Sequence, residues 1–104
     1  INAHHENRKY LAGCALSPAL IAVSDLAAAV SEADVIVMAT PAQYFAATFA
    51  AVAQHARAGT PVINTAKGIS METGERLSQI AQRIAPQLPY GVLSGPSFAH
   101  EVAK

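Results

Sequence analysis

The sequence predicts an α/β fold with a parallel sheet, and three observations support this prediction. Short apolar runs alternate with longer segments whose apolar residues recur at helical spacing. The run at residues 35–39 is almost entirely apolar, as is typical of a parallel strand covered on both faces. Residues 35–39, 62–65 and 90–93 each end in a polar or glycine-containing turn that leads into a helix. In a parallel sheet such turns share one edge, outside the carboxyl ends of the strands, where ligands bind.

Composition narrows the class of protein. The 104 residues are enough for one small domain, and 52% apolar against 13% charged residues favours a packed core over disorder. A formal net charge of zero gives no indication of nucleic acid or of an anionic membrane surface as a partner. Cys14 is the only cysteine, which excludes an internal disulfide and fits a reducing compartment. No apolar run is long enough to insert into a membrane, and no leader is visible.

The first third of the chain is predicted as helix, strand and helix. Residues 1–9 are polar and read as the tail of a solvated helix, and residues 20–23 as a short strand. Ser24 is the expected N-cap of a helix over residues 26–32, with Asp25 in its first turn. The chain begins with Ile1 rather than Met, and we expect that this residue is not the first of the natural protein.

The remaining helices follow from apolar stripes. Residues 43–57 carry an apolar stripe and end near Gly59, and residues 73–84 carry a second. Ser97 is a candidate N-cap for a last helix over residues 98–103. The members of the two stripes are Phe45, Phe49, Val52 and Ala53, then Leu77, Ile80, Ala81 and Ile84.

Four positions near the predicted strand ends are candidates for binding. Lys67 follows the strand 62–65, and its ammonium would reach a phosphate, hydroxyl or carbonyl at the sheet edge; the alternative is a solvated loop lysine. Gly95 allows close approach of a ligand and Ser97 offers a hydroxyl, or both belong to an ordinary capped loop. Tyr44 would lie against a flat ring system or in the core.

Other kinds of site find no support in the sequence. His100 is conceivable as a general base, but a solvated helix face suits it better. His4 and His5 are adjacent, so they point to different sides of a helix and do not form a metal pair. The sequence has no Gly-x-Gly-x-x-Gly motif, no paired carboxylates and no cysteine–histidine set at metal spacing.

The turns together resemble the bacterial NAD(P)-dependent glycerol-3-phosphate dehydrogenase family. The stretch with the most specific likeness is Gly95-Pro96-Ser97-Phe98-Ala99, followed by Glu101-Val102-Ala103. Residues 64–69 and 7–13 are similar too, although Ala12 stands where the family usually has proline. Ala33-Asp34 before a strand and Pro41-x-Gln43 after it also fit, so the resemblance spans nearly the whole chain.

The resemblance implies a cofactor, a substrate and site residues. Enzymes of this family interconvert glycerol 3-phosphate and dihydroxyacetone phosphate with NAD or NADP, and feed phospholipid synthesis. Carried over to this sequence, Lys67 would contact both cofactor and substrate, Gly95 and Ser97 the substrate, and Ala99 and Tyr44 the cofactor. We therefore expect a small-molecule substrate, a cytoplasmic location and no nucleic acid.

The resemblance also implies that parts of the family's architecture lie outside this chain. The expected fold is a Rossmann-type, doubly wound parallel sheet lacking its first two strands, so residues 1–104 form an incomplete N-terminal dinucleotide-binding domain. With the family's strand order, residues 20–23 would not be a neighbour of residues 35–39. The helical second domain, with its general-base lysine and a homodimer contact, would lie downstream. No catalytic residue is expected here, and the fragment alone should be inactive.

Two other readings remain open from the sequence. One is another two-domain NAD(P) dehydrogenase, of the 6-phosphogluconate or ketopantoate type, against which the stretch at residues 95–99 argues. The other is a module that keeps a nucleotide-type fold without catalysis. A glycine-rich loop upstream and a helical domain downstream would favour the enzyme.

Overall fold

A computed structural model describes residues 1–103, apart from the side chains of Ala99 and His100. The chain forms two compact units, Asp25–Ser94 and Ile1–Ser24 with Gly95–Lys104. None of the helices in the described part of the chain is long and apolar enough to cross a membrane.

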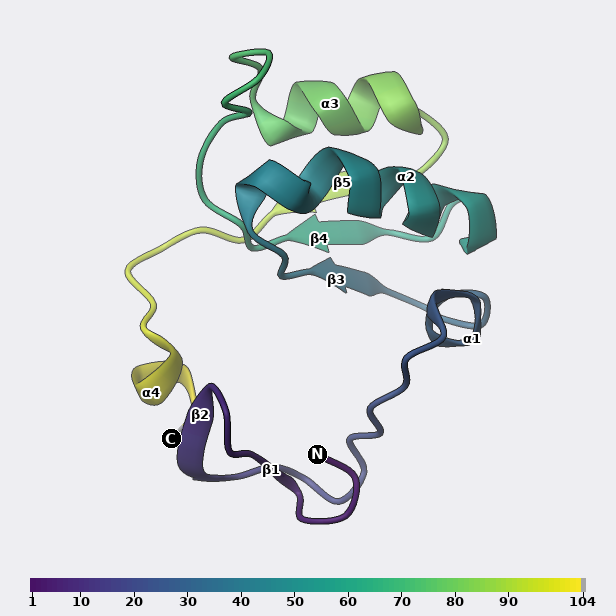
Figure 1. Cartoon of the computed structure of the whole chain (residues 1–104). Coiled ribbons are helices and arrows are strands. Elements are labelled where there is room, and N and C mark those ends of the chain that lie inside the picture. Colours follow the sequence, from purple (N-terminus) through teal and green to yellow (C-terminus); the bar gives the residue numbers. More distant parts are fainter. Residues whose placement is uncertain (104) are drawn as a thin grey trace. The chain divides into compact units, whose positions relative to one another are not determined.

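The first unit is built on a parallel three-stranded sheet. Its strands are β3 (Ile36–Met38), β4 (Val62–Asn64) and β5 (Tyr90–Val92), hydrogen-bonded in the order β3-β4-β5. Figure 1 shows the three arrows side by side and pointing the same way. The strands predicted at residues 35–39, 62–65 and 90–93 are thus confirmed with their order and direction, each one or two residues shorter than expected.

Two helices cover one face of this sheet. They are α2 (Phe45–His55), which follows the 3₁₀ turn η1 (Ala42–Tyr44), and α3 (Leu77–Ile84). Figure 1 shows both on the same side of the strands, as expected when sequential parallel strands are joined by crossovers of one hand. The stripes predicted from the sequence face the sheet and form the core. The buried core residues on these helices are Phe45, Phe49, Val52, Leu77, Ile80 and Ala81.

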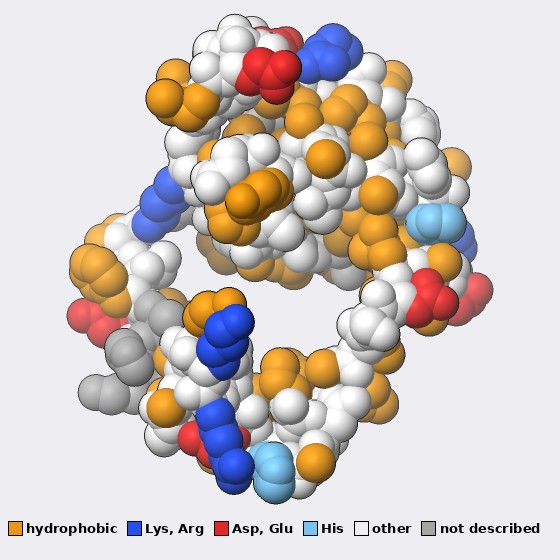
Figure 2. Space-filling model, viewed as in Figure 1, with side chains coloured by type: hydrophobic (Ala, Val, Ile, Leu, Met, Phe, Trp, Pro, Cys, Tyr) orange, Lys and Arg blue, Asp and Glu red, His pale blue; other side chains and the backbone are white. Residues whose placement is uncertain are grey.

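The other face of the sheet is not covered by these helices. Val35 and Val37 are 53% and 61% exposed, while Ile36 and Met38 between and beyond them are buried. The expectation that residues 35–39 are covered on both faces is therefore wrong for this chain. The reason is topological, because both connections return over the same face. Figure 2 shows hydrophobic side chains at the surface of this unit.

Helix α1 (Leu26–Val30) starts at the predicted residue but has another cap, and helix α3 starts four residues later than predicted. Helix α1 is capped by Asp25, whose carboxylate accepts from the N–H groups of Ala27 and Ala28, so the assignment of the N-cap to Ser24 is wrong. Helix α3 begins at Leu77 rather than at residue 73. Residues 70–75 instead form a tight turn, in which Ser70 N donates to Glu75 O at 2.9 Å.

The amino-terminal residues form a hairpin rather than a helix, so the prediction for residues 1–9 is wrong. Strand β1 (Glu6–Asn7) pairs antiparallel with β2 (Leu11–Ala15). The Glu6 carboxylate accepts from Gly13 N at 2.9 Å, and Asn7 Oδ1 accepts from Tyr10 N at 3.2 Å. Such bonds from side chains to the backbone compete with the hydrogen bonds of a helix. This polar segment has no apolar stripe that would favour the helix instead.

Residues 20–23 are not a strand, which corrects a further prediction. Leu20, Ile21 and Val23 are all roughly half or more exposed, and no described strand pairs with them. The side chain of Asn2 bonds to both backbone groups of Ala22, and Leu20 N donates to Ser17 O at 3.0 Å. A short apolar run forms a strand only when a neighbouring strand pairs with it. The prediction that residues 20–23 are a strand that does not neighbour β3 therefore stays a prediction for a longer chain.

Helix α4 (Ala99–Val102) starts one residue later than predicted. The N–H groups of Glu101 and Val102 both donate to Phe98 O, which makes Phe98 the residue before the helix. The expected N-cap, Ser97, lies one residue too early for that position.

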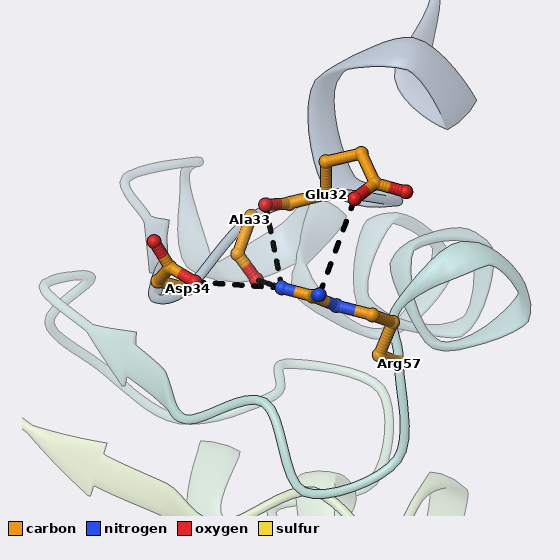
Figure 3. A network of polar contacts seen from close by, with 4 residues as sticks. All are labelled: Glu32, Ala33, Asp34 and Arg57. Carbon is orange, nitrogen blue, oxygen red and sulfur yellow. Dashed lines mark hydrogen bonds and ion pairs between the residues drawn. The ribbon is translucent and has the colours of Figure 1, made fainter.

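Arg57 joins the end of α2 to the turn between α1 and β3 (Figure 3). Its Nη2 donates to Ala33 O at 3.1 Å and Glu32 O at 3.4 Å, and lies 3.5 Å from Asp34 Oδ1. Asp34 and Glu32 are largely exposed, so these ion pairs add little, and the bonds to the two carbonyls do more to fix where β3 begins.

Candidate functional site at the carboxyl edge of the sheet

Lys67 lies in a turn that is tied to the sheet on both sides. The Thr65 N–H and hydroxyl both donate to Met38 O of β3, at 2.9 and 3.1 Å. The buried side chain of Asn64 bonds to both backbone groups of Ala66, at 3.0 and 3.1 Å. The turn is therefore a fixed extension of β4 rather than a loose loop, and Lys67 is the first residue beyond it.

A cleft of about 410 Å³ lies beside this turn, within the same unit. Lys67 and Arg76 are the two cationic residues among those that line it. The remaining lining is mostly apolar and comes from the turn after β4, the start of α3 and β5: Asn64, Ala66, Gly68, Ile69, Leu77, Ser78, Tyr90, Val92 and Ser94. Such a cleft suits a small ligand that has both a polar or anionic group and an apolar part.

The start of α3 adds to the positive potential of this cleft. Arg76 precedes the helix, and a guanidinium has no acceptor atom, so Arg76 cannot cap the N–H groups of Leu77 and Ser78. Its own N–H donates to Gln79 Oε1 at 3.0 Å. The positive end of the helix dipole and two cationic side chains thus surround the same space.

Tyr90 lies on the apolar side of the cleft. Its ring packs edge-on against Phe45 and Phe49, with centroids 6.2 and 6.3 Å away. Burial raises the pKa of the Tyr90 hydroxyl, and the nearby Asn64 side chain offsets part of that rise without forming a full hydrogen bond to it. The phenol is therefore protonated at neutral pH, and it makes no hydrogen bond to any described residue.

Tyr44 lies at the same edge of the sheet as Lys67. Its side chain is 59% exposed, so the reading of Tyr44 as a core aromatic is wrong. Ala42, two residues earlier in η1, lies against the turn after Lys67, since a Cβ built on Gly68 would be 3.4 Å from Ala42 Cβ. The structure therefore brings the η1 turn next to the Lys67 turn and leaves the Tyr44 ring available for contact.

The other three candidates belong to the second unit. Gly95 and Ser97 are exposed and precede α4, which begins at Ala99. The side chain of Ala99 lies outside the described residues, as does that of His100, so the structure assigns neither a contact. Lys67 and Tyr44 are thus brought to one edge, while Gly95 and Ser97 are seen only within their own unit.

Sequence reasoning missed two residues of this site. Asn64 interrupts an apolar strand with a buried amide, and Arg76 stands directly before an apolar helical stripe where an acceptor is the usual cap. A polar residue in an apolar strand and a basic residue before a helix are both visible in the sequence, so they are the signals that could have identified Asn64 and Arg76. Among the described residues, no group of three or more His, Cys, Asp or Glu side chains is placed to hold a metal ion.

A parallel sheet with its connecting helices and a cleft at the carboxyl ends of the strands defines an α/β protein of the Rossmann type. A family model described as NAD-dependent glycerol-3-phosphate dehydrogenase N-terminus matches residues 1–104. The chain belongs to this family.

Individual relatives agree with the family match. The chain is 44% identical over 102 residues to glycerol-3-phosphate dehydrogenase [NAD(P)+] 2 of Sphingopyxis alaskensis, covering 98% of this chain and 31% of that protein. It is 46% identical over 99 residues to the Mesorhizobium japonicum glycerol-3-phosphate dehydrogenase [NAD(P)+], covering 95% and 29%. The crystal structure of glycerol-3-phosphate dehydrogenase from Coxiella burnetii matches with a TM-score of 0.89 at 27% identity, covering 98% and 31%. The chain thus spans about a third of the length of these proteins.

Proposed function

We propose that this chain is part of an oxidoreductase that interconverts sn-glycerol 3-phosphate and dihydroxyacetone phosphate with NAD or NADP, and that feeds phospholipid synthesis. The observation that supports it most is the position of Lys67, at a cationic cleft beyond the end of β4, in a chain that matches the family along its whole length. Both reactants carry a phosphate, and the ketone has a carbonyl oxygen on which negative charge develops during reduction.

Each candidate residue has a proposed role in this reaction. Lys67 contacts both substrate and cofactor, and its ammonium stabilises charge developing on the substrate oxygen. Gly95 and Ser97 contact the substrate through a close backbone approach and a hydroxyl. Tyr44 and Ala99 contact the cofactor, and the exposed Tyr44 ring suits a flat ring system.

The residues present fit part of a nicotinamide cofactor. The cationic edge and the exposed Tyr44 ring suit an anionic molecule with flat rings. When bound, the nicotinamide supplies or accepts the hydride. The residues of this chain orient the two reactants and stabilise charge, while the pyrophosphate-binding glycine loop is proposed to lie in a segment that precedes residue 1.

The proposal includes a division of labour between domains. Residues 1–104 form an incomplete N-terminal dinucleotide-binding domain, and a helical substrate domain follows. That second domain supplies the general-base lysine and the contact for a homodimer, so the fragment alone is inactive. The complete protein acts in the cytoplasm on small molecules.

The alternatives have less support. A dehydrogenase of the 6-phosphogluconate or ketopantoate type would keep the same sheet, and a non-catalytic module would keep the cleft. Neither explains why the whole chain matches the glycerol-3-phosphate dehydrogenase model and relatives more than 40% identical bear that name.

The test is an assay of the complete protein for oxidation of NADH and NADPH. Dihydroxyacetone phosphate, ketopantoate and a reaction without substrate are compared, and 6-phosphogluconate is tried with the oxidised cofactors. We expect turnover with dihydroxyacetone phosphate alone among the ketones, reversed by glycerol 3-phosphate with oxidised cofactor. Turnover only with one of the other two substrates, or cofactor binding without any turnover, would overturn the proposal.

A further inference from the structure

We infer that Asn64 is the positioning residue of the site, because its side chain fixes the backbone from which Lys67 extends. The inference rests on the proposed function, in which the Lys67 ammonium contacts the substrate. It assigns to Asn64, which lines the cleft, a role that acts through Lys67.

The first observation is that Asn64 is buried and polar. Its side chain is 2% exposed at the end of β4, a place that an apolar residue would fill without needing partners. A buried amide is costly unless its donors and acceptor are satisfied. The buried amide of Asn64 must therefore have hydrogen-bond partners.

The second observation is that the side-chain hydrogen bonds of Asn64 go to the backbone of Ala66. Asn64 Nδ2 donates to Ala66 O at 3.1 Å, and Ala66 N donates to Asn64 Oδ1 at 3.0 Å. The amide thus pairs with both backbone groups of Ala66, as a neighbouring strand would. Because Ala66 lies directly before Lys67, this pairing fixes the peptide from which the lysine starts.

The third observation is that the surrounding backbone is held by separate contacts. Leu93 N donates to Asn64 O at 2.9 Å, and Thr65 N donates to Met38 O at 2.9 Å. These bonds anchor Asn64 and Thr65 to β5 and β3, but not Ala66. Loss of the Asn64 amide would therefore remove the side-chain bonds to Ala66, directly before Lys67, while the sheet itself stays paired.

The consequence concerns the reach of the lysine. A displacement of about 1 Å of a catalytic contact lowers the rate by up to about a hundredfold. A shift of the Ala66 peptide would displace the backbone of Lys67, and the fit of its ammonium to the substrate oxygen in the transition state would be poorer. This predicts a loss in kcat that is larger than the change in KM.

The experiment is a double-mutant cycle on the complete protein with dihydroxyacetone phosphate. The variants are Asn64→Leu, Lys67→Ala and both together, with Thr60→Val as the matched control. Thr60 is the other buried polar residue of the described core, and it lies before β4, at the end of the strand opposite to Lys67. Melting curves of all variants accompany the kinetics.

We expect Asn64→Leu to lower kcat/KM about tenfold or more in the parent protein, and less than about twofold in the Lys67→Ala background. Thr60→Val should leave kcat/KM unchanged even where it lowers the melting temperature. A full Asn64→Leu effect in the Lys67→Ala background would overturn the inference and leave the proposed function intact. A Lys67→Ala variant with unchanged kcat/KM would overturn the inference and the proposed role of Lys67, whereas the proposed activity fails only if the parent protein does not turn over dihydroxyacetone phosphate.

A second variant protects the test against misfolding. Asn64→Asp keeps an acceptor for Ala66 N and loses the donor to Ala66 O, so its kcat/KM should lie between those of the parent and Asn64→Leu. Amide hydrogen exchange gives an activity-independent reading. In Asn64→Leu the Ala66 amide should lose protection, in Asn64→Asp it should keep more of it because its acceptor remains, and in both variants the Thr65 amide, bonded to Met38, should stay protected. Equal protection of Ala66 in all three proteins would contradict the inference.

Discussion

A Cβ built on Gly68 would lie 3.4 Å from the Cβ of Ala42, so the turn that follows Lys67 lies directly against the turn that carries Tyr44. Gly68 also has a φ of 122°, a conformation that residues with a side chain rarely adopt. Two loops that are far apart in the sequence are therefore held in contact at the edge of the sheet by a residue without a side chain.

Replacing Gly68 should damage the site as well as the fold. Gly68→Ala forces either a strained φ or a shift of the Lys67 turn, at a cost of about 1–3 kcal/mol. Gly74→Ala is the matched control, because Gly74 also has a positive φ, of 71°, but lies in an exposed turn with no atom near a built Cβ. Both variants should melt earlier than the parent, and only Gly68→Ala should lower kcat/KM. Equal catalytic losses would show that the contact with Ala42 has no special role.

The core beneath the sheet should depend on the aromatic cluster. Phe49 is fully buried, and its ring stacks on Phe45 with a centroid separation of 5.4 Å. Phe49→Ala removes these contacts and leaves a cavity, which should cost about 3–5 kcal/mol of unfolding free energy. Phe98, 71% exposed, provides the control, since Phe98→Ala should change stability little. Denaturant unfolding measures both, and similar losses for the two variants would contradict the packing described.

Arg57 should contribute to stability through its bonds to carbonyls rather than its ion pairs. Arg57→Ala removes the donors to Glu32 O and Ala33 O and should cost about 1 kcal/mol. Arg57→Lys keeps the charge but lacks the planar guanidinium whose Nη2 donates to both carbonyls, so it should restore little. Thermal melting at low and at high salt distinguishes the two causes. A loss that disappears at high salt would indicate that the ion pairs dominate.

The hairpin of the amino-terminal unit should weaken in acid. The Gly13 N–H bonded to Glu6, together with Arg8, lowers the pKa of the Glu6 carboxyl below its ordinary value of 4.5. A lowered folded-state pKa gives stability that is present above pH 4.5 and is lost as the pH falls through the folded value. The Gly13 amide chemical shift, followed by NMR, should titrate below pH 4.5 in the parent and not in Glu6→Gln. An unchanged titration in Glu6→Gln would assign it to another group.

The sheet could be predicted because each strand is recognisable from its own short stretch of sequence. Each strand is an apolar run ended by Pro, Gly or a polar residue, and stripes such as Phe45 and Phe49 show which helix face is buried. Strand order then follows from the short crossovers. The resemblance in the turns identified the family before any geometry was known.

The predictions that were wrong concern residues whose structure depends on partners distant in the sequence. Residues 20–23 look like a strand but pair with no described strand, and Glu6 and Asn7 bond to backbone across a hairpin that no periodicity reveals. The roles of Asn64 and Arg76 required three-dimensional placement, since a polar strand end and a basic helix start are common individually. Ala99 and Ser97 remain predictions that rest on the resemblance.

The central claim is that Lys67 contacts the substrate, and steady-state kinetics of Lys67→Ala in the complete protein, with dihydroxyacetone phosphate, test it most directly. Loss of a charge-assisted contact costs about 1.5–3 kcal/mol, so kcat/KM should fall roughly ten- to over a hundredfold. Lys67→Arg should not restore it fully, because a planar fork does not replace a compact ammonium. The melting temperature should barely change, since a lysine beyond a strand end adds little to the core. Near-normal catalytic efficiency in a folded Lys67→Ala variant would contradict the claim.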